Sequence, residues 1–310
     1  MGGGPDNIPA DPLKSLLTPE LFSLLVNARL PYQKQESINF SDFGRDIFLQ
    51  DPFGPLVKGK VWPALIALSK IGLDRMPDLS ACYLPAPTDP TFPEQCLGLQ
   101  LLLDLCPRLL CRGVDQRWTF AYFDVLSQRV AEGWYFLPPS QRPDQWPQPD
   151  DAGQLDYWIG ARFWFGVSFA HSEHLRHQEM ALEFTEETRS IVERVSRQRD
   201  PYRKTRNEIL QDLYGFPREY RRGPPLGDKV TRESWAFWAG MLMDIHKPIV
   251  DRFGRYPYLN AVFGRASTAD EEKWIDETDH FGEAGKDVAR KIKEDVRLGR
   301  WRPLGEGSLC

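Results

Sequence analysis

The 310-residue sequence predicts an all-α fold, and three observations support this prediction. Helix-start signals, in which Thr precedes Pro or an acidic residue, recur along the chain. Apolar residues then follow at spacings of three and four, which is the helical period. Alternation of apolar and polar residues, which is typical of a half-buried strand, is scarce. We therefore expect helices from one end of the chain to the other.

The expected helices follow in chain order from these signals. The first begins after Thr18, has Pro19 at its first position and continues through Leu21–Val26. A capping box at Thr91–Glu94 opens a strongly apolar helix, and a third start signal lies at Thr268–Glu271. Between them the spacing predicts helices over about 58–72, 115–132, 154–165, 170–198, 204–213, 231–254 and 282–297.

Proline-rich segments separate these helices. They lie at 84–93, 137–149 and 216–227, and loops of this length either carry function or serve as surface connections. We expect a flexible tail over residues 1–16, one helical domain over 17–297 and a loose tail over 298–310.

Composition excludes several classes of protein. With 39 basic and 44 acidic residues the formal charge is −5, which argues against broad binding to nucleic-acid phosphates. No apolar run approaches the 18 or more residues of a membrane span, and the N-terminus lacks the pattern of a signal peptide. Five cysteines without CxxC spacing, including Cys106 and Cys111, are typical of buried reduced thiols. We expect a cytoplasmic protein without nucleic-acid or membrane partners.

Motifs for common cofactors are absent from the sequence. It contains no phosphate-binding GxxxxGK[ST], no GxGxxG, no HExxH and no GxSxG. His171, His174 and His177 are spaced three apart, but on one helix such positions turn around the axis and do not converge on a metal. We expect neither a cofactor nor a metal ion.

One polar cluster follows directly after an apolar run. His171, Ser172 and Glu173 succeed the apolar segment Phe163–Ala170. A polar triplet that emerges from an apolar wall is typical of a pocket rim, where Glu173 orients or charges the imidazole. The alternative is a helix-starting cluster in which Ser172 and Glu173 only cap a turn.

Two further clusters are rich in arginine. Asp104, Arg108 and Arg112 share one helix face, as buried ion-pair partners or as anion receptors. In the second cluster His246 shares the inward face with Ile249, Val250 and Phe253, and a turn carrying Arg255, Asn260 and Arg265 follows Gly254. These donors either join helix ends by binding unpaired carbonyls or receive a substrate carboxylate or carbonyl.

In order and spacing, these clusters resemble the DUF924 family, a helical group with a tetratricopeptide-like superhelical fold. The matching pieces are Asp104-x-x-Pro-Arg108-x-x-x-Arg112-Gly113, Phe169-Ala-His171-Ser172-Glu173 with Gln178, and His246 through Thr268. The resemblance spans roughly residues 40–280. It implies one α-solenoid-like domain with a cleft where the three motifs meet, but no established reaction.

The chain departs from the family pattern in an informative way. Leu105-Cys106 replaces a usual Gln-aromatic pair, and Tyr258-Leu259 replaces a usual His-Arg pair. As a divergent member of this family, the chain is expected to have a more apolar cleft, in which the following polar residues remain: Arg108, Arg112, His171, Glu173, Arg252 and Arg255.

From these patterns we predict a cofactor-independent enzyme that acts on a largely apolar small molecule by isomerisation, cyclisation or pericyclic ring closure. An aromatic-lined pocket with a few convergent polar groups suits such chemistry. We expect His171 and Glu173 to be catalytic, and the substrate-binding residues to be Arg108, Arg112, Ser172, His246, Arg252, Arg255 and Asn260. The alternative is a tetratricopeptide-like scaffold that binds a peptide or protein, in a groove lined by the basic stretch Arg194–Arg206 or by exposed Trp residues.

Overall fold

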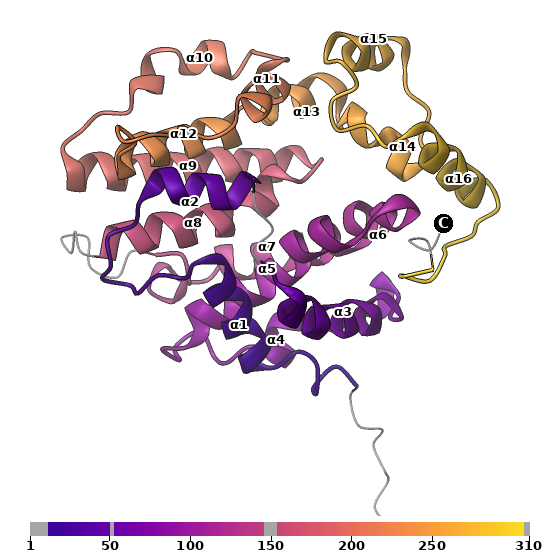
Figure 1. Cartoon of the computed structure of the whole chain (residues 1–310), viewed down its shortest axis with the longest axis horizontal. Helices are drawn as coiled ribbons and strands as arrows, with labels where there is room; N and C mark the ends of the chain where they lie inside the picture. The colour runs from indigo at the N-terminus through magenta and orange to yellow at the C-terminus, as the bar shows by residue number, and fades with distance from the viewer. Residues whose placement is uncertain (1–11, 50–52, 146–153, 307–310) are drawn as a thin grey trace, which may run out of the picture.

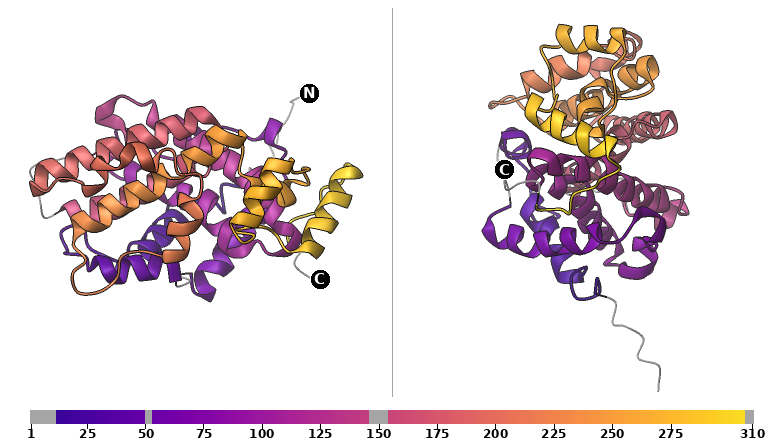
Figure 2. Two further views of the ribbon diagram at one scale, coloured as in Figure 1. Left: turned by 90° about the horizontal axis from the view of Figure 1, so that it is seen from above. Right: turned by 90° about the vertical axis from the view of Figure 1, so that its right-hand side faces the viewer.

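The computed structural model describes residues 12–49, 53–145 and 154–306. All regular elements within these ranges are helical and none is a strand, so the all-α prediction is confirmed. The helices form one domain in which the N-terminal half of the chain lies beneath the C-terminal half (Figures 1 and 2).

The N-terminal half contains seven α-helices in the described residues. Their bounds are α1 (Pro19–Arg29), α2 (Phe40–Leu49), α3 (Pro55–Ser69), α4 (Leu79–Tyr83), α5 (Phe92–Leu110), α6 (Gln116–Trp118) and α7 (Asp124–Tyr135). A π-helical turn over Thr119–Phe123 joins α6 to α7.

The C-terminal half contains nine more in its described part. These are α8 (Leu155–Ala170), α9 (Leu175–Ser196), α10 (Arg206–Ile209), α11 (Gly215–Arg222), α12 (Arg232–Asp244), α13 (Lys247–Phe253), α14 (Asn260–Phe263), α15 (Ala269–Glu277) and α16 (Lys286–Arg297).

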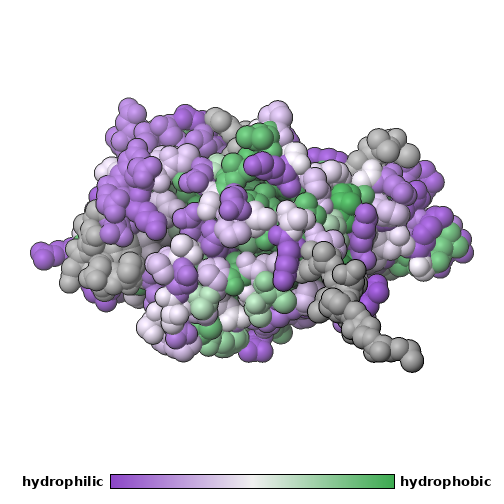
Figure 3. Space-filling view, turned by 90° about the horizontal axis from the view of Figure 1, so that it is seen from below, coloured by the Kyte–Doolittle hydropathy of each residue, from purple (hydrophilic) through white to green (hydrophobic). Residues whose placement is uncertain are grey.

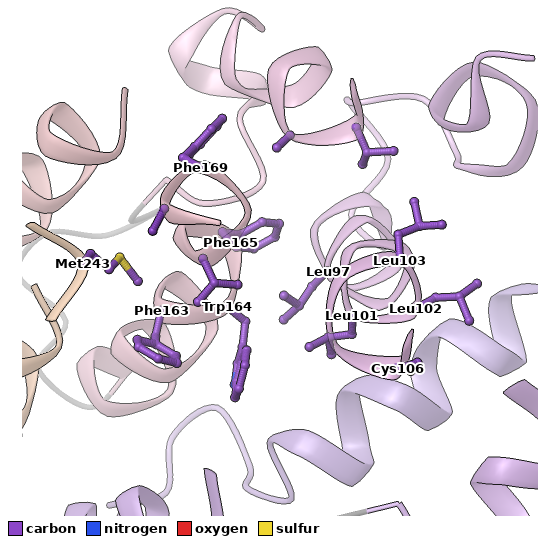
Figure 4. Packing of buried hydrophobic residues seen from close by; sticks show 14 of the residues in the cluster. Leu97, Leu101, Leu102, Leu103, Cys106, Phe163, Trp164, Phe165, Phe169 and Met243 are labelled. Atoms are coloured by element: carbon purple, nitrogen blue, oxygen red, sulfur yellow. The ribbon is translucent and has the colours of Figure 1, made fainter. Parts of the chain in front are cut away.

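Helix α5 forms the centre of the N-terminal half. It packs against α1, α3, α7 and α8, and every residue from Gln95 to Asp104 is buried. Figure 4 shows its Leu97 and Leu101 side chains pointing toward α8, while Leu102 and Leu103 project from another side of the helix. Because α5 is covered on all sides over this stretch, its few polar side chains lie in the protein interior.

Helix α8 connects the two halves. It contacts α5 and α7 on one side and α9 and α12 on the other. Its run Phe163–Ala170 is completely buried, which explains why the sequence there is apolar on every face. The end of α8 is therefore held from both halves of the domain.

Local capping chemistry sets the starts of several helices. Thr18 caps α1 by accepting a hydrogen bond from the Leu21 amide, and Thr268 forms the predicted capping box with Glu271 at the start of α15. The capping box predicted at Thr91 is wrong, because the Thr91 amide and hydroxyl both donate to Asp89 Oδ1 (2.8 and 2.7 Å). The helix nonetheless begins at Phe92.

Three of the predicted helices differ from the observed ones: one begins later, one is divided in two and one is much shorter. The predicted helix over 170–198 begins only at Leu175, after a turn that starts at His171. The predicted helix over 231–254 is divided between α12 and α13, because Pro248 has no N–H to continue the helical hydrogen bonds. The predicted helix over 204–213 contains only α10, a single turn.

The segments predicted as tails pack against the domain where they are described. Leu13 and Leu304 are buried. The Trp301 ring lies 4.9 Å from that of Trp118, and Trp118 Nε1 donates to the Arg302 carbonyl (2.9 Å). Residues 12–16 and 298–306 of the predicted tails therefore pack against the domain through apolar contacts, and residues 1–11 and 307–310 lie outside the described residues.

Three of the four described cysteines are buried, as the sequence predicts, whereas Cys82 is exposed. Cys106 and Cys111 are buried, as is Cys96; Cys310 lies outside the described residues. No helix in the described ranges is long and apolar enough to cross a membrane. On the face shown in Figure 3, hydrophobic residues form small patches between hydrophilic ones.

Candidate functional site

A small cavity lies where α7, the end of α8 and the segment around α14 meet. Its volume is about 140 Å³. The polar side chains of its lining are Asp124, Gln128, His171, Glu173 and His174. The apolar ones include Phe120, Val125, Leu259 and Phe263. The second and third sequence motifs therefore contribute directly to one cavity.

His171 lies at the C-terminal end of α8, where its amide donates to the Val167 carbonyl (2.9 Å). Its side chain is 29% exposed, and its Nδ1 lies 3.0 and 3.2 Å from the two carboxylate oxygens of Asp104 on α5. No hydrogen bond joins Nε2 to any residue that the structure describes. The imidazole thus has one nitrogen fixed and one nitrogen open.

The charge of Asp104 determines which imidazole nitrogen carries the proton. Burial acts to raise the pKa of Asp104, but the nearby Arg108 and His171 outweigh it and lower this pKa to about 2. An ionised carboxylate only accepts hydrogen bonds. In the neutral imidazole the proton is therefore on Nδ1, and the lone pair is on Nε2.

Behind Asp104 lies a chain of buried polar side chains. Ser168 Oγ donates to Asp104 Oδ2 (3.4 Å), and Gln100 Nε2 donates to Ser168 Oγ and to Ser127 Oγ (3.1 Å). Trp134 Nε1 in turn donates to Gln100 Oε1 (3.1 Å). Satisfied buried networks of this kind hold their members in one arrangement. The sequence does not predict this hydrogen-bond network, although Gln100 and Ser168 stand out as polar residues inside apolar runs.

Arg108 forms an ion pair in the interior. Its two terminal nitrogens donate to the two oxygens of Asp124 (2.7 and 2.9 Å), and one of them lies 3.3 Å from Asp104 Oδ1. Of the two alternatives for Arg108, a buried ion-pair partner or an anion receptor, the structure shows the ion pair. Burial raises the pKa of Asp124 against the opposing effect of Arg108, and the negative charge of Asp104 raises it further.

Glu173 does not orient His171, contrary to the sequence-based expectation. Its carboxylate accepts two hydrogen bonds from Arg265 (2.7 Å each) and one from the Tyr256 amide (2.9 Å). The side chain is directed toward the segment after α13, where these donors lie. The carboxylate that contacts the imidazole belongs instead to Asp104, 67 residues away in sequence.

Ser172 is completely buried and has no access to a ligand. Its Oγ accepts from the His174 amide (3.1 Å) and lies 2.7 Å from His177 Nδ1, while His177 Nε2 lies 3.0 Å from Glu132 Oε1. A Ser–His–Glu series is typical of nucleophilic sites, but here it holds the turn that carries His171. Among the described residues, no group of three or more metal-ligating side chains is placed to hold an ion.

His246 is buried, as its apolar neighbours in sequence predicted. Its ring packs 3.8 Å from that of Phe216, and Nδ1 donates to the Leu242 carbonyl (2.8 Å). Burial, together with the charge of His171, lowers the pKa of His246 to about 3. The two imidazole centroids are 6.4 Å apart, but His246 is outside the cavity lining.

The remaining predicted binding residues join helix ends. Arg112 donates to the carbonyls of Arg108 (2.8 Å) and Cys111 (3.3 Å) at the end of α5. Arg255 donates twice to Glu271 (2.6 and 2.7 Å), which links the end of α13 to the start of α15. None of these groups lines the cavity.

Arg252 and Asn260 also bind protein groups. Arg252 pairs with Asp270 (2.6 Å) on the exposed surface. Asn260 donates to Ser267 Oγ (3.1 Å) and accepts from Arg265 Nε (3.1 Å). The geometry at these two residues corresponds to the alternative in which the third motif joins helix termini.

Besides a cavity of about 460 Å³ beside the starts of α1 and α5, which has no histidine in its lining, two still larger cavities lie away from His171. One, of about 720 Å³, is bounded by the segment Met76–Pro87 and another face of α7, with Asp78 and Arg129 among its few polar residues. The other, of about 580 Å³, lies between the starts of α5 and α8. Neither contains a histidine, so we place the candidate chemistry in the smaller cavity.

Comparison with known proteins gave one match. The family model described as "Bacterial protein of unknown function (DUF924)" matches residues 81–279, which is more than half of the chain. A search of curated proteins and a search of solved structures found no match. The matched segment includes His171, Asp104 and the complete cavity lining.

Proposed function

The chain belongs to the DUF924 family, whose function is unknown, and we propose that it is an enzyme in which His171 transfers a proton to and from a small substrate. The observation that carries this proposal is the open Nε2 of His171, backed by Asp104 at 3.0 Å. An imidazole with a fixed Nδ1–H and a free Nε2 is the arrangement that general bases use.

In the proposed reaction, His171 Nε2 takes a proton from the bound substrate. Asp104 stabilises the imidazolium that forms, because the carboxylate is already ionised and in contact with Nδ1. Return of the proton to a different substrate atom completes an isomerisation. In a cyclisation, the deprotonated atom adds to a polarised double bond of the same molecule, and the imidazolium returns the proton to the atom that receives the electron pair of that double bond. The imidazole alone accepts and returns the proton, so the step requires no cofactor.

The cavity restricts the size of the reacting group. An apolar cavity of ~150 Å³ accommodates benzene, and the present cavity is about 140 Å³. Phe120, Val125, Leu259 and Phe263 supply the apolar wall. We therefore propose that a part of the substrate about the size of a six-membered ring enters beside His171.

Deuterium incorporation tests the proposal without a known substrate. The protein is incubated with a mixture of small metabolites in D₂O, and mass spectrometry identifies compounds that gain one deuterium or change retention time. We expect His171→Gln to abolish this incorporation, because it removes the proton acceptor. His280→Gln is the matched control, since the His280 side chain is exposed and pairs with Asp276 and Glu283, away from the cavity lining. Equal incorporation in the wild type and H171Q would refute the role of His171.

A scaffold function is the competing proposal, and two observations bear on it. The expected basic groove is largely neutralised, because Arg203 and Arg206 pair with Glu186 (2.8 and 2.7 Å). The cavity of about 720 Å³ beside α7 is the better place for a partner. Cross-linking through an Ala81→Cys variant in a Cys82→Ser background would reveal a partner there. A scaffold role predicts that partner capture is unaffected by His171→Gln.

A further inference from the structure

The small cavity differs in charge from the arginine-rich motifs around it. The charged groups of its lining are the carboxylates of Asp124 and Glu173, beside the titratable rings of His171 and His174. Arg108 binds the first carboxylate and Arg265 the second (2.7 Å each), but neither guanidinium belongs to the lining. A ligand in the cavity therefore meets carboxylates before it meets arginines.

The charges of this cluster do not balance. Asp104 and Asp124 share the single guanidinium of Arg108, whereas Glu173 has Arg265 to itself. One guanidinium thus serves two carboxylates, and the other basic group in contact with them is the imidazole of His171, which touches Asp104 and not Asp124. Both aspartates are almost completely buried, and buried charge without a counter-charge is unfavourable. A positive group in the cavity, next to Asp124, would supply the missing charge.

The apolar part of the lining fits the remainder of such a ligand. Phe120 and Phe263 line the cavity, and each already has a guanidinium over its ring, from Arg108 (5.6 Å) and Arg265 (4.2 Å) respectively. Aromatic rings attract cations through their faces and also bury a large apolar area against the groups packed on them. The wall thus tolerates a cation and an apolar body together.

We propose that the cavity binds small molecules that carry a protonated amine, with the ammonium group beside Asp124 and the apolar body between Phe120 and Phe263. The identification of this ligand as the substrate rests on the proposed function of His171. The preference of the cavity for cations is independent of that function. The selectivity is opposite to the carboxylate binding that the arginine motifs predicted from sequence.

Three probes that share a cyclohexyl ring and differ in the charge of its substituent test this preference: cyclohexylamine, cyclohexanol and cyclohexanecarboxylate. Binding is measured at pH 7 by chemical-shift changes of the amides around His171 and Asp124. We expect the amine to bind at least about tenfold more tightly than the carboxylate, which corresponds to ~1.4 kcal/mol, with the alcohol between them. Equal or tighter binding of the carboxylate, or no detectable binding of the amine, would overturn the proposal.

Charge changes at Gln128 provide the matched variants. Gln128 lines the cavity one helical turn after Asp124, and among the described residues no hydrogen bond joins its side chain to Asp124, Arg108 or Asp104. We expect Gln128→Lys to weaken amine binding several-fold and Gln128→Glu to strengthen it by a similar factor. Gln198→Lys adds the same charge on an exposed loop and should change binding little. Equal effects of the two lysine variants would show only a long-range charge effect and would contradict the site.

The two proposals fail in different ways. The binding assay needs no turnover, so loss of charge selectivity would refute the amine assignment while leaving the deuterium result intact. Loss of His171-dependent deuterium incorporation, with the amine still preferred, would refute the proposed function alone.

Discussion

Replacing His246 with Asn should remove a pH dependence of stability between pH 7 and pH 5. Burial, together with the charge of His171, lowers the pKa of His246 from 6.5 to about 3. At pH 5 the unfolded chain therefore binds a proton at this residue, and the folded protein does not. Because the pKa of a base is lowered on folding, stability is lost as the pH falls below 6.5.

The magnitude follows from this difference in protonation. The penalty is RT ln(1 + 10^(6.5 − pH)) while the folded imidazole stays neutral, which is about 2 kcal/mol at pH 5 and about 0.2 kcal/mol at pH 7. His246 is only 5% exposed, so solvent screening does not reduce the penalty much. The wild-type protein should lose about 2 kcal/mol more stability than the variant over this range.

Urea unfolding of the wild type and H246N at the two pH values measures this difference. Asn is the suitable replacement because its amide nitrogen can occupy the place of Nδ1 and donate to the Leu242 carbonyl. Other titrating groups, including Asp124 with its raised pKa, are common to both proteins and cancel in the comparison. Equal losses in the two proteins, or an imidazole signal of His246 that titrates near pH 6.5, would refute the assignment of this ring as buried and neutral.

Three further predictions concern packing and the imidazole tautomer. Gly98→Ala should destabilise the protein by ~1–3 kcal/mol because the new Cβ would lie 2.5 Å from Phe22. Gly133→Ala should stabilise α7 by ~0.5–1 kcal/mol because no atom lies within 4 Å of the new Cβ. Thermal unfolding of the two variants compares these effects. Leu304→Ala should cost roughly 2 kcal/mol if residues 298–306 pack as described, and the exposed Leu298→Ala less than ~0.5 kcal/mol in the same assay. Nitrogen NMR should show neutral His171 protonated on Nδ1, and removal of the Asp104 carboxylate should shift this population toward Nε2–H; an unchanged tautomer would contradict the dyad.

The helices and several of their starts could be predicted because the chemistry that sets them is local. Thr18 and Thr268 cap helices with residues three positions later, so each signal is complete within four residues of sequence. Thr91 shows the limit of this reasoning: the same pattern is present, but Asp89 binds the Thr91 amide and hydroxyl instead. A competing acceptor two residues upstream was enough to change the cap while leaving the helix in place.

Of the residues predicted for the site, only His171 and Glu173 line the cavity, and the sequence pairs the imidazole with the wrong carboxylate. His171 and Asp104 were both singled out, but the carboxylate assigned to the imidazole was Glu173, its neighbour in sequence. Spacing along one chain segment identifies neighbours at two to four residues, whereas the contact with Asp104 depends on how α5 packs against α8. The same limit applies to the arginines, since Asp124 and Glu271, which bind Arg108 and Arg255, lie on other helices.

The sequence does contain a signal for the buried hydrogen-bond network behind Asp104. Gln100 is flanked by leucines and Ser168 by aromatic and aliphatic residues, so burial of each was predictable from the surrounding run. A buried polar side chain requires a hydrogen-bond partner. Two such residues on different predicted helices therefore indicate an interior network, although only the packing shows that it ends at Asp104.

The arginine-rich motifs and the acidic cavity have a common physical explanation. A carboxylate in a protein interior is tolerated when a guanidinium accompanies it, and a bidentate pair provides the best geometry. Arg108 and Arg265 meet this need for Asp124 and Glu173, which leaves the two guanidiniums committed to protein groups. The guanidiniums of Arg108 and Arg265 thus stabilise the carboxylates of Asp124 and Glu173 in the cavity wall. Among the described residues His171 lines the cavity with no hydrogen bond at Nε2, so the chemistry that we propose for this site rests on an imidazole and not on an arginine.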